Sequence, residues 1–486
     1  AEDASFTYQV PANTFEDLDG DSLTYGITGL PSSGNLSFDA STRTVSGTPN
    51  NTDIGVHAVT VRATDGDGAF AEDTFNITVT NVNDQPVVTL DTTGSGAAAN
   101  AATFVETDGA DANNNQVSFV KGTGASIEDV DTGDLLGTLK VDFAHNLAAS
   151  DQLIIAGGGS SGADVAVALN TANGGTGTVT VNSVAYTYTV ANDGSSAASI
   201  SFAPASAVSP AEMDNLLKAL QYNNTSDAPT NGATITFGVS VTDDSGSSAT
   251  DGTAATSAVA NFTVTLDETN DTPVVTLDAA GGNANNTGTF TETDGADANN
   301  NQVAFTNGTT NLVDLDSDIT DVKISIASST VTNDDQLLIA GQTFNLGTEN
   351  SGTEIQVDSV FFNVTVDNST NAGTTLITFA SLDGTGGSAA AAAAAKFDSV
   401  LDGLSYNNSS NTAVEGNREF SIVATDNAGT PVSSTAVTMT VTVDETNDTP
   451  TVANVIADQS TAEDASFTYQ VPANTFEDLD GDSLTY

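Results

Sequence analysis

Short runs in which apolar and polar residues alternate make up most of this chain. Typical runs are VHAVTVRAT at 56–64, ATITFGVSV at 233–241 and NFTVTLDE at 261–268, and Asp, Asn or Gly turns follow them. Because successive side chains of a strand point to opposite faces, this period of two predicts half-buried β-strands. Many short strands separated by turns predict an all-β chain of Greek-key, Ig-like or cadherin-like β-sandwiches in an elongated array.

Two stretches carry a helical period instead. In the first, SPAE at 209–212 is a capping box with proline at the first helical position, and apolar residues at helical spacing follow at 213–220. The second has the same apolar stripe at 397–404, after an alanine run at 389–395. Such a stripe can form a partner-binding groove, but packing of a helix on its own core is the favoured interpretation.

A long repeat defines the organisation of the chain. Ala1–Tyr25 reads AEDASFTYQVPANTFEDLDGDSLTY, and Ala462–Tyr486 is identical to it. Chance does not produce such an identity, so the repeat predicts a filament in which this whole unit recurs head to tail. Separate subunits joined by strand donation are the less favoured alternative.

A finer repeat lies inside this unit, where N-D-x-P linkers end at Pro86, Pro273 and Pro450. The linkers predict four segments. These are a short domain without its first strand at 1–84, two long domains at 85–271 and 272–448, and the start of another short domain at 449–486. The long domains share DQLIIAG with DQLLIAG and LQYNNTSD with LSYNNSSN. An additional hairpin is predicted at GTVTVNSVAYTYTV in the first of them.

The charge of the chain limits its partners. The sequence has 64 acidic and 8 basic residues and a formal net charge of −56. Nucleic acids and anionic membranes need a basic face, so neither is an expected partner. The chain has no cysteine, so another device than disulfides must hold extracellular domains together, and cations are needed to offset the repulsion. No apolar run is long enough to span a bilayer.

The acidic residues recur at equivalent places in each domain. An early Glu is followed by an Asp-x-Asp motif, by an Asp in a late turn, and by the Asn-Asp of the linker. The candidate metal ligands are Glu2, Asp17, Asp19, Asp21, Asp65, Asp67, Asn83, Asp84, Glu106, Asp129, Asp131, Asp243, Asn270, Asp271, Glu292, Asp314, Asp316, Asp426, Asn447, Asp448, Asp478 and Asp480. Calcium takes about six to eight oxygen ligands of this kind. Turn formation explains any one motif, but it does not explain an ordered recurrence in three domains. The sequence therefore predicts bound Ca²⁺.

Catalysis is not expected from this sequence. A catalytic triad needs a histidine beside a nucleophile and a carboxylate, and the two histidines, His57 and His145, lie in an expected strand and in an unrepeated segment. Zinc sites need cysteine or clustered histidine. Paired carboxylates could serve a glycosidase, but a pair that recurs in every domain favours a structural role. We therefore expect a protein that is not an enzyme.

The short domain resembles the dystroglycan-type cadherin-like domains of bacterial surface proteins. FEDLDGDSLTY, LPSSGNLSFDASTRTVSGTP, VRATDGDG and NVNDQP occur in that family's order. The long domains resemble repeats of large repetitive adhesins, in which an Asp-x-Asp strand, a short helix and a Y-x-N-x-S segment precede the last two strands. The resemblance implies an extracellular location on a bacterial surface and an adhesive or structural role. A glycan-binding or other ligand-binding module and a protective sheath or surface layer, with lateral self-association, remain as alternatives.

In cadherins, calcium lies at the junctions between domains, and the resemblance implies three such sites here. The first would use Glu2, Asn83, Asp84, Asp129, Asp131 and Asp243; the second Glu106, Asn270, Asp271, Asp314, Asp316 and Asp426; the third Glu292, Asn447, Asp448, Asp478 and Asp480. The chain departs from the cadherin pattern where linkers begin with Asp, because it has Asn81, Glu268 and Glu445 there. The number and affinity of the sites are therefore left open by the resemblance.

Overall fold

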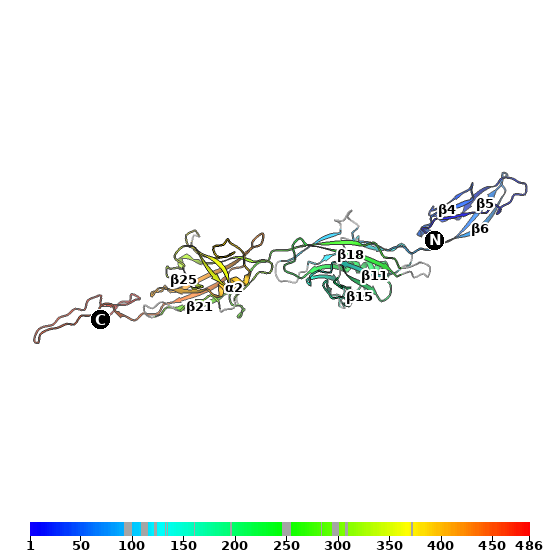
Figure 1. Ribbon diagram of the computed structural model, residues 1–486. Helices are drawn as coiled ribbons and strands as arrows, with labels where there is room; N and C mark the ends of the chain where they lie inside the picture. Colours follow the sequence, from blue (N-terminus) through cyan, green and yellow to red (C-terminus); the bar gives the residue numbers. More distant parts are fainter. Residues whose placement is uncertain are drawn as a thin grey trace. The chain divides into compact units, whose positions relative to one another are not determined.

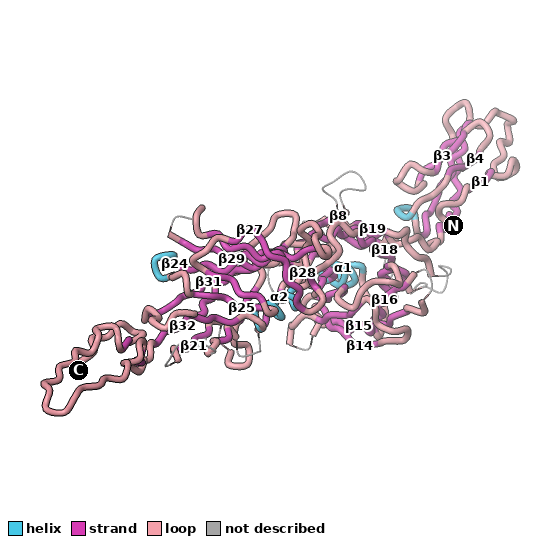
Figure 2. Tube along the Cα trace, turned by 60° about the vertical axis from the view of Figure 1, so that its left-hand side comes forward, coloured by secondary structure: helices cyan, strands magenta, loops and turns pink. Residues whose placement is uncertain are grey.

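The computed structural model describes residues 1–91, 100–107, 115–120, 124–131, 133, 135–159, 161–194, 197–244, 254–282, 284–293, 301–306, 310–370 and 373–486. Strands make up most of the regular structure, and helices are few (Figure 2). The all-β class is therefore confirmed. The chain forms two compact units, of which the first ends at Glu268 and the second consists mainly of Thr269–Tyr486 and also includes Thr107. The four predicted segments are finer than these two units, and their boundaries stay a prediction.

The N-terminal part of the first unit consists of two three-stranded sheets (Figure 1). One sheet has the order β1-β4-β3 and the other the order β2-β5-β6. The bounds are β1 Phe6–Gln9, β2 Thr24–Thr28, β3 Leu36–Asp39, β4 Thr44–Gly47, β5 Gly55–Thr64 and β6 Phe70–Val79, with a 3₁₀ helix at Asn51–Asp53. Leu36, Val45, Val59, Ile77 and Val79 form the buried core between the sheets. This core is small, because most residues of β1 and β6 are exposed.

The rest of the first unit is a larger sandwich. Its seven-stranded sheet has the order β14-β15-β16-β11-β18-β19-β8, its four-stranded sheet the order β13-β12-β17-β9, and β10 pairs with β7. The bounds are β7 Val87–Thr89, β8 Ala101–Val105, β9 Val117–Ser118, β10 Ser126–Glu128, β11 Leu136–Phe143, β12 Asp151–Ile155, β13 Val165–Ala168, β14 Thr176–Val181, β15 Val184–Ala191, β16 Ala198–Pro204, β17 Leu220–Asn224, β18 Thr234–Asp243 and β19 Ala260–Asp267. The predicted additional hairpin is confirmed as β14–β15.

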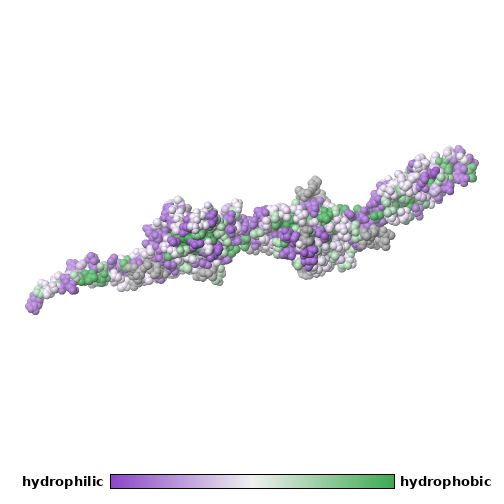
Figure 3. All heavy atoms as spheres, viewed as in Figure 1, coloured by the Kyte–Doolittle hydropathy of each residue, from purple (hydrophilic) through white to green (hydrophobic). Residues whose placement is uncertain are grey.

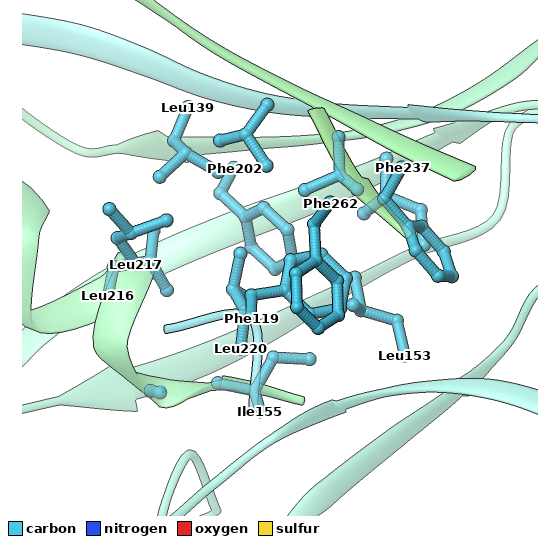
Figure 4. Close-up of a cluster of buried hydrophobic side chains, with 14 of the residues drawn as sticks. Phe119, Leu139, Leu153, Ile155, Phe202, Leu216, Leu217, Leu220, Phe237 and Phe262 are labelled. Carbon is cyan, nitrogen blue, oxygen red and sulfur yellow. The ribbon is translucent and has the colours of Figure 1, made fainter. Parts of the chain in front are cut away.

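Helix α1, Pro210–Ala219, packs on the core of this sandwich (Figure 4). Ser209 and Glu212 form the predicted capping box, and Met213, Leu216 and Leu217 are fully buried. Beside them, the ring of Phe119 lies 4.8 Å from that of Phe237 and 4.9 Å from that of Phe262, measured between centroids. The prediction that the helix packs on its own core is confirmed.

The second unit repeats this topology. Its seven-stranded sheet has the order β21-β32-β31-β24-β29-β28-β27, its four-stranded sheet the order β22-β30-β25-β26, and β20 pairs with β23. The bounds are β20 Val274–Thr276, β21 Asn286–Thr291, β22 Val303–Ala304, β23 Asn311–Val313, β24 Ile319–Ala327, a 3₁₀ helix at Ser328–Thr330, β25 Asp335–Ile339, β26 Gln342–Asn345, β27 Asn350–Val357, β28 Val360–Asp367, β29 Thr374–Leu382, α2 Ala394–Asp402, β30 Ser405–Asn408, β31 Gly416–Asp426 and β32 Val437–Asp444. Helix α2 packs on the core of its sandwich as α1 does, and its residues Phe397, Val400 and Leu401 are buried.

The C-terminal segment of the second unit has little regular structure. Only β33 Thr451–Val452 and β34 Phe476–Glu477 pair with one another. Apolar side chains are exposed along it, as the green surface of Figure 3 also shows, and Val455 is 88% exposed. Its residues 467–470 have the sequence of β1 but form no strand. In the first copy β1 pairs with β4.

Candidate metal centres

The first acidic cluster consists of Glu2, Asn83, Asp84, Asp129, Asp131 and Asp243. The linker residues bring its members together, because the backbone N–H of Asp84 donates to Asp131 Oδ2 at 2.6 Å and Asn83 Nδ2 donates to Asp243 Oδ2 at 2.8 Å. The N–H of Asp131 in turn donates to Asp129 Oδ1 at 3.1 Å. The end of the short domain is thereby connected to two segments of the following sandwich.

Asn51 is a member of this site that the sequence did not predict. Its side-chain amide donates to Asp84 Oδ2 at 2.8 Å and to Asp131 Oδ1 at 3.3 Å. Asn51 lies in the 3₁₀ helix before β5, far in sequence from either partner. Only the pairing of β5 with β6, from Gly55 opposite Val79 onward, brings this loop to the linker end of the domain.

Glu2 is the most deeply buried carboxylate of the first cluster, with 1% of its surface exposed. Its N–H donates to the carbonyl of Thr80, and its Oε1 accepts a hydrogen bond from the N–H of Val82 at 3.0 Å. Its Oε2 is buried and accepts no hydrogen bond from described residues. Burial raises the pKa of Glu2, and the nearby carboxylates of Asp131 and Asp84 raise it further. A cation bound beside Glu2 would offset both the cost of burying its charge and the repulsion from its neighbours.

Asp129 repeats this situation on the other side of the linker. Its Oδ2 is buried and accepts no hydrogen bond from the described part of the chain. Burial is the largest cause that raises its pKa, and Asp131, Asp243 and Asp84 raise it as well. Four carboxylates therefore lie close enough to one another to repel.

The second acidic cluster has the same contacts. Within the second unit it comprises Asn270, Asp271, Asp314, Asp316 and Asp426. Asn270 Nδ2 donates to Asp426 Oδ2 at 2.8 Å, and the N–H of Asp271 donates to Asp316 Oδ2 at 3.1 Å. These are the counterparts of the Asn83–Asp243 and Asp84–Asp131 contacts.

The electrostatics of the second cluster also match those of the first. Asp314 Oδ2 and Asp316 Oδ1 are buried and accept no hydrogen bond within the described ranges. Burial, followed by a hydrogen bond shared with Asp316, raises the pKa of Asp314 to about 6. A divalent cation bound beside Asp314 would favour its ionised form and offset this effect.

Glu106, the sixth predicted member, belongs to the first unit. It is 1% exposed, and its N–H donates to the carbonyl of Asp267, as that of Glu2 donates to the carbonyl of Thr80. Its local setting is thus that of Glu2, and its place in the second cluster stays a prediction from the repeat.

The third acidic cluster consists of Glu292, Asn447, Asp448, Asp478 and Asp480. The N–H of Asp448 donates to Asp480 Oδ2, and the N–H of Asp480 donates to Asp478 Oδ1 at 3.1 Å. Asn447 differs from its counterparts, because its amide donates to the carbonyl of Asp448.

Glu292 is the buried carboxylate of the third cluster, with 2% exposed. Both of its side-chain oxygens are buried and accept no hydrogen bond of normal geometry from described residues, although the backbone of Thr446 lies near enough to lower the pKa. Burial raises the pKa of Glu292, and the carboxylates of Asp448, Asp480 and Glu445 add to this.

The remaining predicted ligands lie at the opposite end of the short domain. Asp17 Oδ1 accepts the N–H groups of Asp19 and Asp21, and Asp65 Oδ1 accepts those of Asp67 and Ala69. The backbone hydrogen bond from Asp21 is the largest cause that lowers the pKa of Asp17. A hollow of about 170 Å³ is lined by both Asp17 and Asp65.

The second copy of this turn shows what it can contact. Asp478 Oδ1 accepts the N–H groups of Asp480 and Asp482, as Asp17 Oδ1 accepts those of Asp19 and Asp21. In the second copy this turn also bonds the linker through Asp480 and Asp448. In the first copy Asp17, Asp19 and Asp21 lie with Asp65 and Asp67 at the end of the short domain away from the first cluster.

The carboxylate and amide oxygens of the three clusters are the kind of ligand that calcium takes, but in this structure they are not arranged around a common centre. Within the described ranges, no group of three or more His, Asp or Glu side chains forms a ready-made metal centre. Backbone and Asn N–H groups bridge the carboxylates instead. No described Lys or Arg forms an ion pair with Glu2, Asp129 or Glu292. Buried carboxylate oxygens without a donor or counter-ion are the ligands that Ca²⁺ takes.

Comparison with known proteins supports an Ig-like fold for the first domain. Residues 1–80 match the family described as putative Ig domain. This stretch is similar to an Ig domain. No relative was found among curated proteins. No helix in the described part of the chain is long and apolar enough to cross a membrane.

Solved cadherin structures are similar to the chain at low identity. Mouse cadherin-23 EC22-24 is 12% identical, with 87% of this chain and 86% of that chain covered and a TM-score of 0.24. Protocadherin gammaB7 EC3-6 is 13% identical, with 90% and 70% covered and a TM-score of 0.23. The human desmocollin-1 ectodomain is 10% identical, with 92% and 59% covered and a TM-score of 0.25. The fold class rests on the sheets described above, because TM-scores of this size do not establish a common arrangement.

Proposed function

We propose that this chain is a structural or adhesive segment of an extracellular filament, and that Ca²⁺ bound at the three acidic clusters makes its junctions stiff. The observation that carries the proposal is the burial of Glu2 and Glu292 beside other carboxylates, with Glu2 Oε2 and both Glu292 oxygens lacking a well-formed hydrogen bond from described residues. A buried charge without a partner costs several kcal/mol, so such groups are retained where a cation pairs with them.

The first cluster explains how binding would stiffen a junction. Its ligands would come from the start of the short domain (Glu2), from the linker (Asn83 and Asp84) and from the following sandwich (Asp129, Asp131 and Asp243). Calcium would supply the positive charge that allows these carboxylates to stay ionised and close together. Because the ion binds only when all three parts are in place, its binding energy favours one linker geometry over the others. The repeat assigns the same role to Glu106 and Glu292.

The extracellular setting of the proposal rests on three features. The chain has no cysteine and a net charge of −56, so calcium would take the stabilising role that disulfides have elsewhere. Metal-linked folding suits a calcium-rich exterior. The resemblance to bacterial surface domains agrees with this setting. The natural partners would be further copies of the unit, with Asp17 and Asp19 placed toward a linker as their counterparts Asp478 and Asp480 are toward Asp448.

A calcium titration followed by calorimetry tests the proposal. Glu292→Gln removes the buried charge of the third cluster, and exposed Glu419→Gln on β31 is the matched control in the same unit. We expect the wild-type chain and E419Q to bind Ca²⁺ equally, and E292Q to lose affinity at one site by about tenfold or more, which is about 1.4 kcal/mol. In chelator E292Q should be at least as stable as the wild type. An E292Q titration that matches the wild type would contradict the proposal.

One observation favours a second candidate function, binding of a regular surface such as a glycan array or ice. Edge strand β14 and its neighbour β15 expose Thr176, Thr178, Thr187 and Thr189, and Thr178 lies opposite Thr187. A row of threonine hydroxyls on a sheet face can bind such a ligand. Binding that persists in chelator and is lost when these threonines become valine would support this role.

A further inference from the structure

Each long sandwich has a buried aspartate at the start of its DQL motif, which the acidic clusters do not include. Asp151 is 5% exposed and Asp335 is 0% exposed. Tyr222 Oη donates to Asp151 Oδ1 at 2.5 Å and Asn224 Nδ2 donates to the same atom at 2.7 Å. Tyr406 and Asn408 donate to Asp335 Oδ1 in the same way. The two sandwiches therefore hold the carboxylate by the same neutral groups.

The second sandwich adds a counter-ion that the first lacks. Arg418 on β31 is 2% exposed, and its Nε donates to both carboxylate oxygens of Asp335 at 3.2 Å. Its Nη2 donates to the carbonyl of Val414 at 2.9 Å, and its Nη1 donates to that of Gly416 at 3.4 Å. The charge of Asp335 is thus paired inside the protein, as buried charges generally are.

The strand registers show which residue takes the place of Arg418 in the first sandwich. Asp243 pairs with Leu136 on β11, and Asp426 pairs with Ile319 on β24, so these two positions are equivalent. Eight residues before them lie Ile235 and Arg418. The partners on the next strand agree with this, because Ile235 lies opposite Val264 and Arg418 lies opposite Val441.

Beside Asp151 there is a hollow where the second sandwich has its arginine. It is open to solvent and has a volume of about 440 Å³. Its lining includes Asp151, Asn224, Pro229, Thr230, Ala233 and Ile235. Ala233 is equivalent to Gly416, whose carbonyl accepts from the guanidinium. Asp151 forms no ion pair with any Lys or Arg that the structure describes.

We propose that this hollow binds a guanidinium group, which pairs with Asp151 as Arg418 pairs with Asp335. The group can come from the arginine side chain of a peptide or from a small guanidine. Guanidinium is favoured over ammonium because its planar donors can bond a carboxylate and a neighbouring carbonyl at the same time. Burial raises the pKa of the Tyr222 hydroxyl, and its hydrogen bond to Asp151 raises it further, so this group stays a donor that holds the carboxylate in place.

The test uses the full chain in saturating calcium, at an ionic strength that screens its general negative charge. Two guanidinium probes, agmatine and a capped Gly-Arg-Gly peptide, distinguish a small guanidine from a peptide. The same peptide with citrulline, a neutral isostere, and the same peptide with lysine are the controls. In calorimetric titrations we expect at least one arginine-type probe to bind about tenfold more tightly than the citrulline peptide, and more tightly than the lysine peptide.

Two variants connect the binding to this site. Ile235→Arg supplies the missing guanidinium from within, so it should abolish binding of the probes and raise the thermal stability of the chain. Asp151→Asn should weaken binding about tenfold or more. Because D151N can disturb folding, I235R decides the outcome. The proposal would be overturned if neither agmatine nor the arginine peptide bound more tightly than the citrulline peptide, or if I235R bound the probes as the wild type does.

Discussion

At the scale of single residues, burial sets the behaviour of carboxyl groups outside the acidic clusters as well. Asp398 lies on α2, and its Oδ1 accepts the N–H of Leu312 at 2.6 Å. Burial, with a smaller contribution from the charge of Asp402, raises its pKa to about 6. At neutral pH the folded chain therefore carries a carboxylate that its surroundings disfavour.

Asp398→Asn should consequently stabilise the chain at pH 7. A raised pKa means that the folded state binds this proton more tightly than the unfolded state, so Asp398 destabilises the fold as pH rises through about 6. Asparagine keeps an acceptor for Leu312 and does not ionise. We expect the melting temperature of D398N to exceed that of the wild type at pH 7, by a difference that shrinks toward pH 4.

Asp367→Asn is the control, because the fold lowers the pKa of Asp367 whereas it raises that of Asp398. The hydroxyl of Thr370 is the largest cause that lowers the pKa of Asp367, so its charged form is favoured by the fold. D367N should gain no stability at pH 7. A difference between D398N and the wild type that does not change with pH would contradict the assignment.

The sequence predicted which carboxylates meet the linkers where a motif repeats, and it did not predict contacts that depend on the fold. Asp131 and Asp316 were predicted from Asp-x-Asp, and both accept a linker N–H. Asn51 carries no such motif, and its role follows from strand pairing. Asp151 was visible only as a repeated DQL motif, because Tyr222 and Asn224 reach it from a distant strand.

At the scale of elements, alternation and capping predicted most strands and α1, but the alanine run shows where propensity fails. Alanine is the best helix former, yet α2 begins only at Ala394. Earlier in the run, Ala392 exchanges backbone hydrogen bonds with Ile319, and Ala390 donates to the carbonyl of Ser381. These residues extend the sheet edge, because tertiary pairing outweighs the small differences in helix propensity.

The repeated segment shows the same dependence on tertiary partners. Phe6–Gln9 is a strand in the first copy, paired with β4, whereas the identical residues 467–470 form no strand. Val10 is 4% exposed and its counterpart Val471 is 39% exposed. A strand without a partner leaves its backbone groups to water, so the identical sequence has two conformations.

This difference can be measured by thiol labelling, because the chain has no cysteine of its own. We expect Val471→Cys to react with a thiol reagent at least about tenfold faster than Val10→Cys, since local opening must precede reaction at a buried site. Both variants should react at one rate in denaturant, which controls for intrinsic reactivity. Equal rates in the native chain would mean that the two copies share one environment.

At the scale of the whole molecule, the net charge of −56 is concentrated in part at the acidic clusters beside the linkers, where carboxylates repel one another. The repeat predicted where carboxylates gather. In the first two clusters the linker Asn and the linker Asp each donate a hydrogen bond to an Asp of the following domain, whereas in the third cluster only the linker Asp does so. No local sequence pattern encodes a preferred geometry of the linkers. Calcium at the clusters is proposed to select that geometry.

Small-angle X-ray scattering of the chain in millimolar calcium, and again in excess chelator at equal ionic strength, tests this claim most directly. Equal ionic strength separates specific binding from general screening of charge. The account predicts the profile of a stiff, extended particle with calcium and that of a flexible chain of domains without it, and the E2Q/E106Q/E292Q variant in calcium should resemble the chelated wild type. Profiles that coincide with and without calcium would contradict it, and the acidic motifs would then be ordinary turns.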